Sequence, residues 1–187
     1  MSMEAFFVSV AIVAVAEIGD KTQLLAMILA TRYRRPVPVI LGILTATLAN
    51  HALAAGLGSA VASWLGPEVM RWSLAALFLA MAVWCLIPDK ADDGPRAGGN
   101  AGAFIATTIA FFLVEIGDKT QIATVALAAR FHDVATVTAG TTLGMMLANV
   151  PAVIFGDALS RRVSLKLVRA VAAAAFAALG MLALAAI

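Results

Sequence analysis

One seven-residue segment occurs twice, without change, in the interior of long apolar stretches. Glu-Ile-Gly-Asp-Lys-Thr-Gln fills residues 17–23 and again residues 115–121, 98 positions later. Each copy places three charged side chains in a segment that is apolar on both sides. Whatever fold the chain adopts must therefore let these charges face one another, water or a bound ion.

The composition is that of an integral membrane protein. Of the 187 residues, 63% are hydrophobic and 13% are charged, and the mean hydropathy is +0.98, whereas a soluble domain has about 25% charged residues. Runs of about 20 apolar residues can cross a bilayer as helices and are too long for barrel strands of about ten residues. We predict an all-α integral membrane protein with six transmembrane helices, over residues 4–31, 36–64, 69–87, 102–130, 134–159 and 168–187.

The repeat divides the chain into two halves of three predicted helices each. The offset of 98 continues past the motif, since Gly42 matches Gly140. We predict a first repeat over residues 1–87, a flexible linker over residues 88–101 and a second repeat over residues 102–187. Because three crossings are an odd number, the second half must enter from the opposite side, as in the inverted repeats of secondary transporters.

Basic residues in the predicted loops orient the protein. Nine lysines and arginines fall on the side of the linker, and two, Arg71 and Arg130, fall on the opposite side. Since basic residues concentrate in cytoplasmic loops, we expect a multi-pass protein of the plasma membrane with a cytoplasmic linker and both termini outside. No basic residue precedes the first apolar stretch, so we interpret it as a retained helix and not as a cleaved signal peptide.

The charged residues of the two motif copies form the candidate site. Glu17 and Asp20 are three positions apart, as are Glu115 and Asp118, so each pair would share one face of a continuous helix. Each charge at the bilayer centre costs about 2.5 to 3.5 kcal/mol, or about 15 to 20 kcal/mol for six of them. A penalty of this size indicates a functional site.

The oxygen atoms of the motif indicate the class of ligand. Oxygen donors without His or Cys favour hard cations such as Mn²⁺ or Ca²⁺. Four carboxylates and two lysines leave a charge of −2, which one divalent cation or two protons would neutralise. Neighbouring carboxylates oppose each other's ionisation, so protons would compete with the metal, and competition at a site that opens to either face is antiport. The predicted metal ligands are Glu17, Asp20, Gln23, Glu115, Asp118 and Gln121, supported by Lys21, Thr22, Lys119, Thr120, Asn50 and Asn149.

A purely structural interpretation of the motif remains open. Glu17 and Lys21, at i and i+4, would form a buried salt bridge within one helix, and the second copy would repeat it. That arrangement leaves both aspartates unpaired. Under either interpretation we expect Gly19 and Gly117 to let two helices approach closely, as small residues do in membrane bundles.

Three further residues carry weaker signals. His51 has no partner at metal-ligand spacing, so we interpret it as a buried packing residue. Asp157, near the end of the fifth predicted helix, is interpreted as interfacial. Cys85 is the single cysteine and offers neither a disulfide nor a metal cluster.

Three other functions fit buried charges in a helical membrane protein. An exporter of small amino acids would need a cationic partner for the substrate carboxylate, for which the motifs offer Lys21 and Lys119. A cation channel needs a continuous pore, which intramembrane lysines disfavour, and an assembly factor gives no reason for duplicated carboxylates. The oligomeric state stays open, a homo-oligomer included, and we expect no nucleic-acid partner.

The twin E-x-G-D-K-T motifs, one in each half, resemble those of the calcium/manganese:proton antiporter family, which has Golgi and bacterial members. The resemblance covers nearly the whole chain. It implies a transporter, not an enzyme, that exchanges Mn²⁺ or Ca²⁺ for H⁺ without a prosthetic group, with manganese efflux as the usual role of bacterial members. Matched to the two motif copies, the resemblance implies that metal and protons bind at Glu17, Asp20, Glu115 and Asp118.

Overall fold

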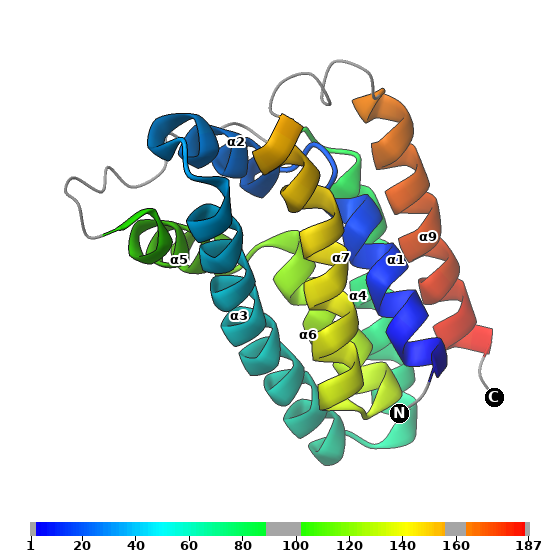
Figure 1. Ribbon diagram of the computed structural model, residues 1–187. Helices are drawn as coiled ribbons and strands as arrows, with labels where there is room; N and C mark the ends of the chain where they lie inside the picture. The colour runs from blue at the N-terminus through cyan, green and yellow to red at the C-terminus, as the bar shows by residue number, and fades with distance from the viewer. Residues whose placement is uncertain (1–2, 89–101, 156–163, 186–187) are drawn as a thin grey trace.

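Two of the six predicted helices are broken at the repeated motif. The computed structural model describes residues 3–88, 102–155 and 164–185 (Figure 1). In both motif copies the first helix ends at the glutamate, and the next begins at the lysine. The prediction of single helices over residues 4–31 and 102–130 is therefore wrong. The observed segments are α1 (Met3–Glu17), α2 (Lys21–Tyr33), α5 (Gly102–Glu115) and α6 (Lys119–Phe131).

A glycine in a left-handed conformation lies in each break. Gly19 has a φ of 79° and Gly117 a φ of 75°, values that glycine adopts without the steric penalty of a side chain. A Cβ atom added at Gly117 would meet no atom within 4 Å. The expectation that both motif glycines serve close helix packing is therefore wrong for Gly117, which serves the turn of the backbone.

The other four predicted spans are continuous helices: α3 (Pro36–Trp64), α4 (Pro67–Cys85), α7 (Val134–Phe155) and α9 (Leu165–Ala185). By length and composition all four can cross a membrane, while α5 is apolar but shorter. This finding confirms a helical membrane protein, and the count of six crossings stays a prediction. Residues 89–101, which are most of the predicted linker, and Asp157 lie outside the described residues.

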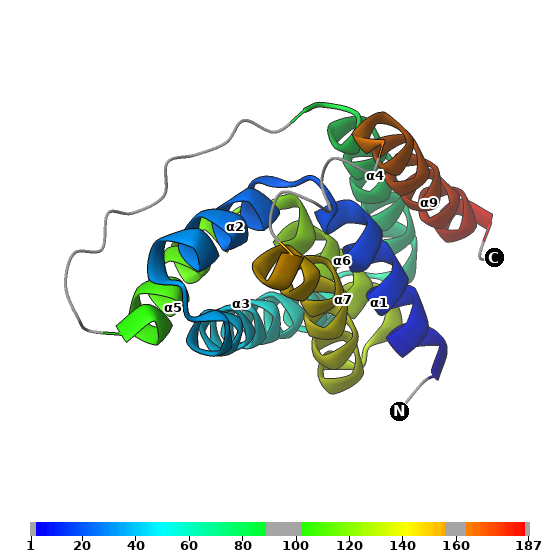
Figure 2. The same ribbon diagram turned by 45° about the horizontal axis from the view of Figure 1, so that its top comes forward.

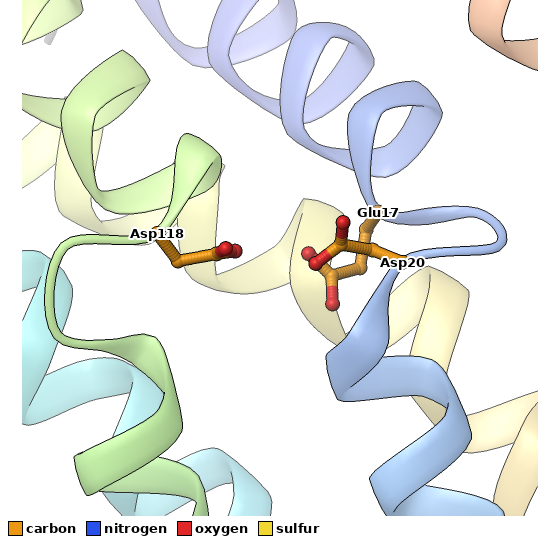
Figure 3. A group of neighbouring side chains, drawn as sticks. All are labelled: Glu17, Asp20 and Asp118. Carbon is orange, nitrogen blue, oxygen red and sulfur yellow. The ribbon is translucent and has the colours of Figure 1, made fainter. Parts of the chain in front are cut away.

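The two halves of the chain interleave. α1 of the first half packs along α7 of the second, α5 packs against α3, and α4 and α9 lie side by side (Figures 1 and 2). α3 and α7, which hold the same place in the two halves, run in opposite directions, as their colours show in Figure 1. This interleaving brings the two broken segments opposite each other (Figure 3).

Two repeat-related glycines allow the interleaved helices to touch at their backbones. A Cβ atom added at Gly42 on α3 would lie 2.8 Å from the carbonyl oxygen of Phe104 on α5. One added at Gly140 on α7 would lie 2.7 Å from the carbonyl oxygen of Phe6 on α1. Both residues of the second contact are related to those of the first by the offset of 98. The same close contact therefore occurs twice, each time between the two halves.

We expect Gly42→Ala to destabilise the protein by about 1 to 3 kcal/mol, because the added methyl group overpacks the contact with α5. Gly56→Ala in the same helix is the matched control, since a Cβ atom there meets nothing within 4 Å, and it should be neutral or slightly stabilising. Thermal unfolding in one detergent measures both variants. Equal melting temperatures for the two would contradict the close contact.

Candidate metal site

Three carboxylates converge where the broken segments face each other. Glu17 is the last residue of α1, and Asp20 and Asp118 immediately precede α2 and α6. Asp118 points across the gap toward the other two (Figure 3). One oxygen from each residue lies within 4.8 Å of the others, and the residues are only 0 to 2% exposed. Oxygens on opposite sides of a Ca²⁺-sized ion are at most about 5 Å apart, so one cation can contact all three.

The breaks give these side chains their positions. Asp20 and Asp118 have extended backbones, with ψ of 167° and 164°, directly before a new helix. Each break is closed by the motif glutamine. The side-chain oxygens of Gln23 and Gln121 accept hydrogen bonds from the glycine amide four residues earlier, over 2.9 and 2.7 Å. These hydrogen bonds engage the amide oxygens of Gln23 and Gln121, which were predicted to be metal ligands.

Each motif aspartate forms an ion pair with the lysine of the other motif copy. Lys21 Nζ lies 3.0 Å from Asp118 Oδ1, and Lys119 Nζ lies 3.2 Å from Asp20 Oδ1. The structural interpretation of the motif placed each lysine on a glutamate of its own helix and left the aspartates unpaired. That expectation is wrong for the aspartates, because the ion pairs join the two halves of the chain.

Glu115 lies in a different environment from its counterpart Glu17. Its Oε1 accepts a hydrogen bond from Thr120 Oγ1 at 2.6 Å and lies 3.4 Å from His51 Nε2. Glu17 Oε1 instead accepts a hydrogen bond from Asn149 Nδ2 at 3.3 Å. His51 is fully buried, as expected of a packing residue, but its contact with Glu115 places it in the site. The sequence could not show this, because the two residues meet only through the packing of α3 on the second break.

The two asparagines predicted to support the site make different contacts. Asn149 contacts a carboxylate, as described above, whereas Asn50 Oδ1 accepts a hydrogen bond from Gln121 Nε2 at 2.6 Å. Gln23 Nε2 donates to a backbone carbonyl of α7 at 3.0 Å, and Thr22 is fully buried in the first turn of α2. One asparagine thus lies against the carboxylates, and the other holds a motif glutamine.

With His51 counted as neutral, the ion pairs leave the two glutamates as the uncompensated charges of the site. Four ionised carboxylates and two lysines sum to −2, and the lysines contact the aspartates. Glu17 Oε2 and Glu115 Oε2 are buried and have no hydrogen-bond partner among the described residues. Since an uncompensated buried charge is strongly unfavourable, a bound cation or protons must neutralise the glutamates.

The two breaks differ in what covers them. A Cβ atom added at Gly19 would lie 2.5 Å from Leu165 Cδ2, at the start of α9. At the second break, Ile116 is 56% exposed and a Cβ atom at Gly117 would meet nothing within 4 Å. The first break is therefore covered by the second half of the chain, whereas the second break is exposed at the protein surface.

Known proteins resemble this chain over nearly its whole length. The family model described as "Divalent cation/proton antiporter GDT1" matches residues 5–93 and 103–186. A Vibrio cholerae protein named "Putative manganese exporter" is 53% identical over 175 residues, which cover 93% of this chain and 87% of that protein. A GDT1-like protein of Synechocystis is 31% identical over 187 residues, which cover 89% of each chain. GDT1-like protein 3 of Oryza sativa is 27% identical over 199 residues, 92% of this chain and 71% of that protein. No solved structure matches the chain significantly.

Proposed function

Because this chain belongs to the GDT1 divalent cation/proton antiporter family, we propose that it exchanges Mn²⁺ for protons and exports Mn²⁺ across the plasma membrane. The family is one of transporters, so the protein is not an enzyme. The observation that carries the proposal is the buried group of Glu17, Asp20 and Asp118, with oxygens within 4.8 Å of one another. The name of the Vibrio relative favours Mn²⁺ over Ca²⁺ as the cargo.

The cation would bind between the two broken segments. Glu17, Asp20 and Asp118 supply carboxylate oxygens, which hard divalent cations prefer. Glu115 lies outside this group of three in the present conformation, and Thr120 holds one of its oxygens. We therefore assign the first three residues to the cation and Glu115 to charge neutralisation by a proton, with a ligand role only after rearrangement.

Exchange follows from the charge of the site. The site carries −2 when all of its groups are ionised, and burial makes that charge unfavourable. One divalent cation or two protons bring it to zero, so the protein can rearrange in either loaded form and not when empty and ionised. Cation movement is therefore coupled to proton movement in the opposite direction.

The interleaved halves supply a means of alternating access. The repeat-related helices α3 and α7 run in opposite directions (Figure 1), which supports six crossings arranged as an inverted repeat. The first break is covered by Leu165 of α9, while the second is exposed. In an inverted repeat the two halves can exchange such conformations, and the access to a central site then switches from one face to the other.

The contacts of the lysines count against the rival transporter. An amino-acid exporter would need a cation for the substrate carboxylate, but Lys21 already contacts Asp118, and Lys119 contacts Asp20. The burial of the four carboxylates, which are 0 to 2% exposed, likewise counts against a channel with water at its charged site.

We expect purified protein in proteoliposomes to accumulate Mn²⁺ when the lumen is more acidic than the outside, because protons leaving the lumen drive metal inward. About tenfold excess of Ca²⁺ should slow this uptake only in part if Mn²⁺ is the preferred cargo. A fluorescent metal indicator in the lumen measures the rate. A rate of Mn²⁺ uptake that does not depend on the pH gradient would contradict antiport. Full inhibition by equimolar Ca²⁺ would contradict the preference for Mn²⁺ over Ca²⁺.

The proposed orientation has its own test. In a Cys85→Ser background, a cysteine at Asn100 should react with an impermeant maleimide only from the cytoplasm, and one at Ser2 only from outside. The expectation rests on nine basic residues on the linker side against two on the other. Labelling of both positions from the same side would mean an even number of crossings between them and would rule out the inverted repeat.

A further inference from the structure

A pocket apart from the metal site lies where α4 begins and where α6 and α9 end. Its volume is about 440 Å³, and Arg71 of α4 and Arg130 of α6 both line it. The rest of the lining includes His132 and the apolar side chains of Met70, Leu74 and Ala183. The pocket therefore combines two permanent positive charges with an apolar wall and has the size of a small-ligand site.

The two arginines have no carboxylate partner in the part of the chain that the structure describes. Their recorded contacts are with neighbouring aromatic rings, Arg71 at 5.4 Å from the ring centre of Trp72 and Arg130 at 5.6 Å from that of Phe131. Arg71 Nε is buried and has no hydrogen-bond partner among the described residues. Such a group is unfavourable unless a ligand accepts its hydrogen bond.

Their place in the sequence makes the arginines unusual. They are the two basic residues on the side of the membrane that the loop charges assign to the exterior, where lysine and arginine are otherwise depleted. The exposed Trp72 lies next to Arg71 in the chain, and tryptophan is enriched at the interfaces between membrane and water. An anion that contacts both arginines would therefore lie at the membrane interface, at the level of the lipid headgroups.

We propose that this pocket binds an anionic phospholipid, with the phosphate on Arg71 and Arg130 and the start of an acyl chain along Met70, Leu74 and Ala183. Arginine forms paired hydrogen bonds with phosphate oxygens, and basic pockets between membrane helices bind lipid headgroups. The apolar wall selects a lipid over free phosphate, which would gain nothing from it. The site is independent of the carboxylates that bind the transported cation.

The test is a titration of delipidated, detergent-solubilised full-length protein with phosphatidylglycerol, followed by native mass spectrometry. We expect Arg71→Gln and Arg130→Gln each to weaken phosphatidylglycerol binding by about tenfold or more, as loss of a charged hydrogen bond does. Arg35→Gln is the matched control, since Arg35 is exposed before α3 and outside the pocket. Phosphatidylcholine, which carries a phosphate but no net charge, should bind at least about tenfold more weakly.

Three results would overturn the proposal. Phosphatidylglycerol could bind both variants and the wild type equally, or phosphatidylcholine could bind as tightly as phosphatidylglycerol. Inorganic phosphate at millimolar concentration could displace phosphatidylglycerol in an arginine-dependent way, which would assign the pocket to free phosphate. Melting temperatures show whether the variants are folded. If Arg71→Gln does not fold, Arg71→Lys replaces it and should still weaken binding, because lysine cannot form the paired hydrogen bonds of arginine with phosphate; unchanged binding by a folded Arg71→Lys would count against the proposal.

Discussion

Asp20→Asn is expected to reduce Mn²⁺ transport by at least about 100-fold, and Asp118→Asn to do the same. Each change removes one of the three carboxylates that can contact a single cation. It also removes the partner of a lysine in the other motif copy. An uncompensated buried charge costs about 3 to 5 kcal/mol, and each 1.4 kcal/mol is about a tenfold effect. The measurement is Mn²⁺ uptake into proteoliposomes at equal protein content.

A double variant separates the ligand role of Asp20 from its ion pair. Asp20→Asn combined with Lys119→Gln removes both partners of the 3.2 Å contact and keeps the charge of the site at −2. We expect this variant to regain thermal stability but not transport, because the cation still lacks a ligand. Glu68→Gln, at an exposed carboxylate of α4, should transport as the wild type does. Recovery of transport in the double variant would show that Asp20 serves only the ion pair.

Transport by the wild-type protein is expected to be electroneutral. A pH gradient should drive Mn²⁺ against its concentration gradient, whereas a potassium diffusion potential at equal pH should change accumulation by less than about twofold. If one net charge crossed per cycle, 100 mV would be worth about 2.3 kcal/mol, or about 50-fold in accumulation. The reason for neutrality is that one divalent cation and two protons each cancel the −2 of the site.

Lys21→Gln is expected to break this balance. It leaves the ionised site at −3 and removes the Lys21 contact with Asp118. Transport should then become sensitive to voltage or stop, unless an additional proton is carried. Lys166→Gln, at an exposed lysine in the first turn of α9, is the control and should stay electroneutral. A wild-type response to voltage as strong as the response to pH would show that the lysines are not counted in the transported charge.

The sequence by itself determined the class of the protein and predicted the chemistry of its candidate site. Hydropathy and the lengths of the apolar runs are local properties, so they predicted a helical membrane protein and placed α3 at its observed bounds. Twin motifs with intramembrane carboxylates predicted a site for a divalent cation, and their resemblance predicted the family that the comparisons show. These conclusions needed only the kinds and the order of the residues.

Tertiary structure decided how the motif is used. Glycine followed by aspartate is a signal for a helix end and an N-cap, but the apolar runs on both sides of Gly19 and Gly117 favoured continuous helices over the observed breaks. Once the helices are broken and the halves interleaved, the partners of the charged side chains come from the opposite half. For this reason Lys21 contacts Asp118, His51 contacts Glu115, and three of the four carboxylates gather within the reach of one cation. Such contacts join residues about 60 to 100 positions apart and depend on how helices pack, which a local sequence pattern does not contain.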